Sequence, residues 1–125
     1  WVLEKVGLDS ARSRRLSTYS KGMLQRIGIA QAILHDPELI FLDEPMSGLD
    51  PIGRKMIKDL LLELKKSGKA IFLNSHILPD VEAVCDKYAI IAGGKILKQG
   101  AMRDLSESLE ATFMQIIAGE KIDVQ

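Results

Sequence analysis

Two adjacent carboxylates, Asp43 and Glu44, directly follow the apolar run "LIFL" and precede Pro45. Neighbouring carboxylates repel each other, and their charge is costly near a buried strand unless a cation or hydrogen-bond donors offset it. A divalent cation that also binds phosphate would do so, because Mg²⁺ favours one or two carboxylates together with phosphate oxygens and water. The alternative is an ordinary surface turn after a strand, and the acid pair alone leaves both interpretations open.

A second polar group, Asn74, Ser75 and His76, follows the apolar run "AIFL". Ligands of parallel α/β sheets bind beyond the carboxyl ends of the strands, and both polar groups stand at such ends. The ordinary alternative for His76 is a hydrogen-bonded polar residue without a catalytic role. The two groups together indicate a polar edge that carries carboxylates and an imidazole.

The stretch "YSKGM" at 19–23 places a hydroxyl, a cation and a glycine where a helix should begin. Ser20 suits the cap of that helix. A helix N-terminus also presents unpaired N–H groups and a partial positive charge that bind phosphate, and Gly22 lets the backbone come close to a ligand. The capping role and the phosphate role are compatible.

The elements that position these residues alternate between strand and helix. Helical spacing covers 20–34, with Met23, Leu24, Ile27, Ala30 and Leu34 expected on the buried face. A second helix follows Asp50 and Pro51 and stops at Gly68. The apolar runs between the helices are continuous, which is typical of strands buried on both faces of a parallel sheet. Further segments are a short helix at 79–88, a hairpin that turns at Gly93–Gly94, and a helix at 108–119. Together they predict an α/β fold with a parallel sheet.

Composition excludes several classes of function. The chain has 125 residues and a formal net charge of +0, with 17 basic and 17 acidic residues. This balance argues against a broad electrostatic grip on nucleic acid or an anionic membrane. No apolar run approaches the roughly 20 residues that a membrane span needs. The single cysteine, Cys85, cannot form an internal disulfide and fits a reducing compartment.

Four short motifs stand in a fixed order along the chain. They are "YSKGM" at 19–23, "LIFLDEP" at 39–45, "SGLD" at 47–50 and "NSHIL" at 74–78. In this order and spacing they resemble the signature, Walker B, D-loop and H-loop motifs of the ATP-binding-cassette (ABC) ATPases, the nucleotide-binding domains of ABC transporters. The segment "AIIAGGKILKQG" resembles the hairpin that follows in the family.

The resemblance implies a fold and a division of the chain. The expected fold is part of a P-loop NTPase (RecA-like) three-layer core with parallel strands, part of the helical signature subdomain, and a C-terminal β-hairpin plus helix. The expected parts are 1–36 for the signature subdomain, 37–100 for the ATPase core and 101–125 for a helical extension. No glycine-rich loop that ends in Gly-Lys-Ser/Thr occurs. We therefore expect the C-terminal half of an ABC ATPase domain, which by itself binds ATP weakly or not at all and is inactive.

The resemblance also implies roles at the acid edge, with ATP and Mg²⁺ as cofactors. Asp43 would hold Mg²⁺, mostly through water. Glu44 would be the general base that orients or polarises the attacking water, and His76 would hydrogen-bond the γ-phosphate. Phosphoryl transfer depends mainly on such positioning and electrostatics.

At the helix start, Ser20 and Gly22 would grip the γ-phosphate of ATP held by a partner subunit, and Asp50 would shape the dimer contact beside the site. The signature departs from Leu-Ser-Gly-Gly-Gln at Tyr19, Lys21 and Met23. Lys21 either adds a cation near the phosphates or points to solvent, which we favour. This form resembles the ATPases of ABC-2 type exporters.

The implied partners are a second ATPase subunit, in a homodimer or heterodimer, and a separate transmembrane permease. The implied location is cytoplasmic, at the inner face of the cell membrane through the permease, with no nucleic acid and no membrane span of its own. Two alternatives stay open: an ABC-type ATPase of DNA maintenance or translation, and a non-catalytic interaction module. Intact Asp43, Glu44 and His76 argue against the module.

The resemblance makes one topological prediction. In the family, the strand that leads into Walker A lies between the H-loop strand and the strand that matches 88–92. The strands at 70–73 and 89–91 should then each lack one neighbour, while the Asp43 strand still pairs in parallel with the His76 strand. Phe72 and Ile90 on adjacent paired strands would contradict this arrangement.

Overall fold

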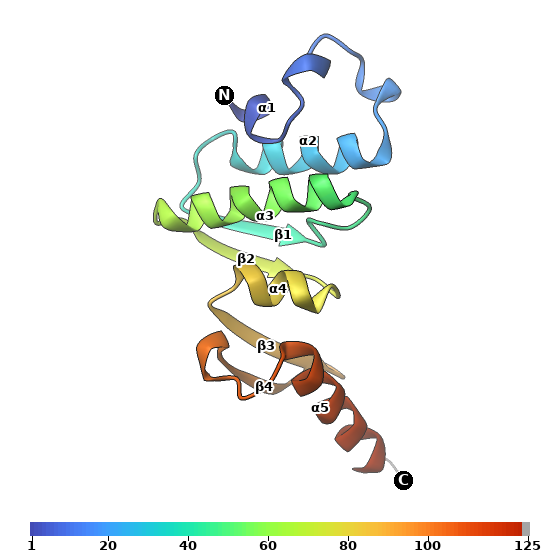
Figure 1. Cartoon of the computed structure of the whole chain (residues 1–125), viewed down its shortest axis with the longest axis vertical. Helices are drawn as coiled ribbons and strands as arrows, with labels where there is room; N and C mark the ends of the chain where they lie inside the picture. The colour runs from blue at the N-terminus through green and yellow to red at the C-terminus, as the bar shows by residue number, and fades with distance from the viewer. Residues whose placement is uncertain (124–125) are drawn as a thin grey trace. The chain divides into compact units, whose positions relative to one another are not determined.

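The computed structural model describes the backbone of residues 1–123 and the burial of the side chains of residues 1–119. The chain forms two compact units, Trp1–His76 and the residues from Ile77 onward, which are described separately. The functional division into 1–36, 37–100 and 101–125 stays a prediction. Along the first unit follow α1 (Val2–Lys5), two short 3₁₀ turns, α2 (Lys21–Ile33), β1 (Leu39–Asp43), α3 (Pro51–Lys66) and β2 (Ala70–Asn74) (Figure 1).

The two long helices of this unit begin where their caps predict. Ser20 Oγ accepts a hydrogen bond from the Met23 amide at 3.2 Å, which starts α2. Asp50 Oδ1 accepts one from the Gly53 amide at 2.7 Å, and Pro51 occupies the first turn of α3. Both caps satisfy backbone donors that a helix leaves unpaired.

The buried face of α2 differs from the prediction. Ile29, Ala30 and Ile33 are buried, whereas Leu24 and Leu34 are exposed. Ala30 is buried as predicted, but the prediction was wrong for Leu24 and Leu34, because apolar residues line more than one side of this helix and tertiary packing selects one of them. The core of the first unit also includes residues of the α1 region, β1 and α3: Val6, Leu8, Ile40, Ile57, Leu60 and Leu61.

Strands β1 and β2 pair in parallel as predicted, with Asp43 opposite Asn74. The expectation that both faces are buried was wrong. Ile40 is buried, but Phe41 and Phe72 on the other face are 69% and 62% exposed. These two rings are register partners with centroids 5.8 Å apart. Helices α2 and α3 contact the strands, and within the described chain they leave one apolar sheet face in solvent.

The second unit holds α4 (Leu78–Val84), the hairpin β3 (Lys87–Ala92) and β4 (Lys95–Ala101), and α5 (Leu109–Asp123). The hairpin turns at Gly93–Gly94, where both residues have positive φ, as predicted. Helix α4 ends at Val84, before the predicted end at 88, because the backbone turns extended at Cys85 and strand β3 follows at once.

Within the described residues, β2 pairs with β1, and β3 pairs with β4. Phe72 and Ile90 therefore lie in separate ladders, and each of β2 and β3 has one neighbour, as predicted. Among residues 1–123, no helix has the length and apolar character to cross a bilayer.

Candidate functional site

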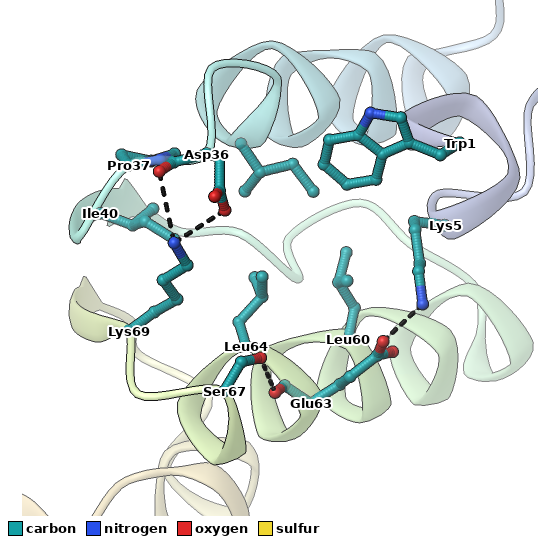
Figure 2. Close-up of a pocket in the computed structure, with 11 residues that line it drawn as sticks. Trp1, Lys5, Asp36, Pro37, Ile40, Leu60, Glu63, Leu64, Ser67 and Lys69 are labelled. Atoms are coloured by element: carbon teal, nitrogen blue, oxygen red, sulfur yellow. Dashed lines mark hydrogen bonds and ion pairs between the residues drawn. The ribbon is translucent and has the colours of Figure 1, made fainter.

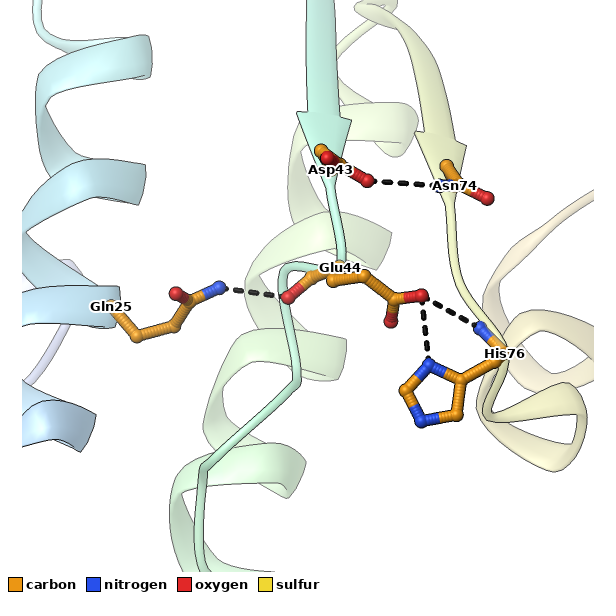
Figure 3. Close-up of polar contacts among 5 residues, drawn as sticks. All are labelled: Gln25, Asp43, Glu44, Asn74 and His76. Atoms are coloured by element: carbon orange, nitrogen blue, oxygen red, sulfur yellow. Dashed lines mark hydrogen bonds and ion pairs between the residues drawn. The ribbon is translucent and has the colours of Figure 1, made fainter.

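The carboxyl ends of β1 and β2 form one polar edge. Asp43 ends β1, Asn74 ends β2, and Asn74 Nδ2 donates to Asp43 Oδ1 at 2.8 Å (Figure 3). Both residues are exposed. The parallel register therefore brings the two predicted polar groups together, and the Asp43 carboxylate stands at the edge of the sheet rather than inside it.

Glu44 follows β1 in an unusual backbone conformation. Its φ is +49°, in the left-handed region that few non-glycine residues adopt. Its amide donates to the Asn74 carbonyl at 2.8 Å. Its carbonyl accepts from the Ser47 amide at 3.1 Å and from Gln25 Nε2 at 2.8 Å (Figure 3). Hydrogen bonds on both sides of the residue hold this strained turn in place.

The turn directs the Glu44 side chain to His76. Oε1 accepts from the His76 amide at 3.1 Å and lies 2.8 Å from His76 Nδ1. The His76 side chain is 76% exposed and that of Glu44 30%. The imidazole donates through Nδ1 in this contact, which leaves Nε2 facing away from the carboxylate (Figure 3).

Glu44 Oε2 is buried and has no hydrogen-bond partner among the described residues. Buried carboxylate oxygens are normally satisfied, so an unpartnered one calls for a donor such as a water molecule. A carboxylate that is fixed through one oxygen and has no hydrogen bond on the other keeps a lone pair available, which a general base needs. The chemistry that this geometry allows at the acid edge is proton acceptance by the Glu44 carboxylate.

The start of α2 lies beside the segment that follows Glu44. A Cβ on Gly22 would lie 3.6 Å from Leu49 Cδ2, and one on Gly48 would lie 3.3 Å from Lys21 Cε. The structure thus brings "SKG" and "SGLD" together, with Asp50 capping α3 next to them. Lys21 is exposed, while its methylene groups pass over Gly48.

The first turn of α2 contains no acidic residue. Lys21 stands there instead, so no carboxylate of the helix offsets the partial positive charge of its N-terminus. The first turn of α3 has no acidic residue either, so this charge pattern is compatible with an anionic ligand but is shared by a helix start with a side-chain cap.

The acid edge supplies only part of the ligands that a metal ion needs. Within residues 1–123, no cluster of three His, Cys, Asp or Glu side chains has the geometry to hold a metal ion. The exposed Asp43 carboxylate supplies one hard oxygen ligand, which fits Mg²⁺ because this ion takes its remaining ligands from phosphate and water.

A cavity of about 170 Å³ lies at the opposite end of the strands (Figure 2). Asp36 precedes β1, and Lys69 precedes β2; Lys69 Nζ lies 2.7 Å from Asp36 Oδ1. Lys5 pairs with Glu63 at its rim. The charged side chains that line the cavity are thus paired with one another. The cavity lies away from the acid edge. Its apolar lining is Trp1, Ile33, Ile40, Leu60 and Leu64.

Sequence reasoning missed Gln25. Its contact with the Glu44 carbonyl joins residues 19 positions apart. The only sequence signal is its place on the helix that "YSKGM" begins, one and a half turns after Ser20.

The comparisons with known proteins agree with this arrangement. Residues 1–47 match the family model "ABC transporter". The chain is 50% identical over 96% of its length to an ABC transporter ATP-binding protein of Synechocystis sp., of which it covers 34%. It is 42% identical over 77% of its length to a fluoroquinolones export ATP-binding protein of Mycobacterium tuberculosis, of which it covers 32%.

Solved structures show the same fold. The structure of an ATP-binding subunit of an ABC transporter superposes with a TM-score of 0.83 at 30% identity, over 93% of this chain and 51% of that one. The ADP conformation of the ATP-binding cassette MJ1267 gives a TM-score of 0.74 at 24% identity, over 94% and 47%. The fold is therefore that of the P-loop NTPase domains. More specifically, the chain is similar over more than nine-tenths of its length to ABC transporter ATP-binding proteins, and it spans about a third of the length of the first curated relatives.

Proposed function

We propose that the chain supplies the hydrolytic edge of an ATP-hydrolysing subunit of an ABC transporter. The observation that carries this proposal is the Glu44–His76 pair, with one carboxylate oxygen held at 2.8 Å and the other buried without a partner in the described residues. In this proposal Glu44 Oε2 accepts a proton from the attacking water. His76 keeps Glu44 in position and presents Nε2 to the γ-phosphate.

Mg²⁺ and ATP are the proposed cofactors. Asp43 would hold the ion, mostly through water, at the end of β1 beside Glu44. When bound, Mg²⁺ neutralises charge on the phosphate oxygens. Asn74 fixes Asp43 through Oδ1, so the carboxylate is oriented without further ligands from the protein.

The start of α2 is proposed to serve the ATP of a second subunit. Ser20 and Gly22 would present a hydroxyl and a close backbone to its γ-phosphate, at a helix N-terminus without an acidic side chain in its first turn. The contact of Lys21 and Gly22 with Gly48 and Leu49 supports a shared dimer surface that Asp50 helps to shape. We propose that Lys21 points toward solvent at the edge of this dimer surface.

The working partners would be that second subunit and a separate transmembrane permease, with the protein held at the cytoplasmic face of the membrane through the permease. Export is supported by the M. tuberculosis relative, whose name describes fluoroquinolone export. The "YSKGM" form of the signature supports the same direction.

The test compares Glu44→Gln with Glu38→Gln in the complete ATP-binding protein. Glu38 is an exposed carboxylate just before β1, at the other end of the strand. Glu44→Gln should reduce ATP turnover at least about a hundredfold, the usual contribution of a general base. It should keep ATP binding and prolong the ATP-bound dimer. Glu38→Gln should behave as the wild type. Near-normal steady-state hydrolysis by Glu44→Gln would refute the assignment.

A further inference from the structure

We propose that Gln25 is a positioning residue for Glu44, and that α2 thereby joins the phosphate-gripping helix start to the base of the same subunit. This inference rests on the proposed function and adds to it a residue and a physical connection. Gln25 lies on α2, Glu44 follows β1, and the hydrogen bond between them measures 2.8 Å (Figure 3).

The backbone of Glu44 needs such support. At φ +49° a glutamate occupies a conformation that persists only where its surroundings over-determine it. A return to an extended backbone would rotate the side chain away from His76, and the contact of Oε1 with Nδ1 would be lost. The aim of the buried Oε2 therefore depends on the turn.

Two backbone contacts and one side-chain contact hold the turn. The Asn74 carbonyl and the Ser47 amide belong to the strand pair and to the turn itself. The third contact is made by a side chain, with Gln25 Nε2 donating to the Glu44 carbonyl. It is also the contact that comes from α2, so a substitution can remove it without changing the backbone.

Helix α2 makes this contact sensitive to its own N-terminus. Ser20 caps the helix, and Gln25 lies about 7.5 Å further along the axis at the rise of 1.5 Å per residue. A hydrogen-bonded helix moves as one body over this length, so a shift of its first turn also moves the Gln25 amide. In the proposed dimer the first turn contacts the ATP of the partner, while Glu44 acts on the ATP of its own subunit. Through Gln25, the position of Glu44 at one ATP site would depend on whether the first turn of α2 contacts ATP at the other site.

The experiment uses the complete ATP-binding protein and three variants of α2. Gln25→Met keeps the length of the side chain and removes the amide donor. Gln25→Lys keeps an N–H donor of similar reach. Gln31→Met makes the same chemical change at an exposed glutamine of the same helix. The measurements are kcat and KM for MgATP, and the lifetime of the ATP-bound dimer by sedimentation or light scattering.

Gln25→Met should lower kcat by about ten- to a hundredfold, the scale of a misplaced catalytic group, with KM within twofold. Its ATP-bound dimer should last longer, because hydrolysis is slow while the helix start is intact. Gln25→Lys should recover part of kcat, and Gln31→Met should match the wild type.

Two results would overturn the inference while the proposed function stands. One is a wild-type kcat in Gln25→Met when Glu44→Gln is inactive. The other is loss of the ATP-driven dimer in Gln25→Met, which would mean that Gln25 supports the helix start rather than the base. Normal hydrolysis by Glu44→Gln would instead refute the proposed function, and the inference with it.

Discussion

Substitution of Ser20 by aspartate separates the capping role of this residue from its proposed phosphate role. Ser20 Oγ accepts from the Met23 amide at 3.2 Å at the start of α2. Ser108 Oγ accepts from the Ala111 amide at 3.1 Å at the start of α5, so Ser108→Asp is a matched control. Aspartate caps as well as serine, and its charge at a helix N-terminus adds about 0.3–1 kcal/mol of stability. Neither variant should unfold more easily than the wild type.

The two variants should differ when ATP brings two subunits together. At Ser20 the new carboxylate would face the γ-phosphate of the partner's ATP. Two unit negative charges about 4 Å apart repel by about 4 kcal/mol at an effective dielectric constant near 20. This corresponds to an ATP-driven dimer weakened about a thousandfold. Salt and solvent would screen part of the repulsion, so a hundredfold is the lower expectation.

The assay has two arms. Thermal unfolding followed by circular dichroism checks the cap, and Ser20→Ala serves there as the reference, with an expected loss of about 1 kcal/mol. Dimerisation with ATP is then measured by sedimentation in the complete protein that carries Glu44→Gln. If Ser20→Asp dimerises as well as Ser108→Asp, Ser20 is only a helix cap and its proposed contact with phosphate is wrong.

Two further predictions concern stability and association. Gly7 has φ +67°, and a Cβ there would lie 2.7 Å from Met56 Cε, whereas Gly68 has φ +89° with nothing within 4 Å. Gly68→Ala should therefore cost about 1–2 kcal/mol of unfolding free energy for the backbone alone. Gly7→Ala should cost a little more, because the flexible end of the Met56 side chain must also move aside. Chemical denaturation measures both costs, and a Gly7→Ala variant more stable than Gly68→Ala would contradict this reasoning. Phe72, 62% exposed, should promote association of the 125-residue chain, so Phe72→Lys should lower its sedimentation-derived mass at high concentration. An unchanged mass distribution would show that this face does not drive association.

The features that sequence predicted well are those that depend on local geometry. The caps at Ser20 and Asp50 each involve an amide three residues further on, and the turn at Gly93–Gly94 requires positive φ. The acid edge was also predictable, because the carboxyl ends of parallel strands meet on one side of a sheet. These rules need no knowledge of the rest of the fold.

Long-range features were not predictable in the same way. Leu24 and Ile33 are both apolar, and only packing against other elements decides that Ile33 is buried and Leu24 exposed. The partner of Gln25 is the carbonyl of Glu44, 19 residues away. Glu44 has a left-handed φ, and because it is not a glycine, the sequence does not indicate a turn with positive φ there. A polar side chain on a helix predicts exposure to solvent, not a contact with the backbone of another segment.

The register of the two strands, rather than the covering of the sheet, fixes the candidate site. One face of the β1–β2 pair lies open at Phe41 and Phe72, yet Asp43 still stands opposite Asn74. A slip by one residue would move β2 about 3.3 Å along β1 and turn its side chains to the other face. His76 Nδ1, now 2.8 Å from Glu44 Oε1, would then lie beyond hydrogen-bond reach. Because the Glu44 amide bonds to the Asn74 carbonyl, the same register also supports the left-handed turn that aims the base.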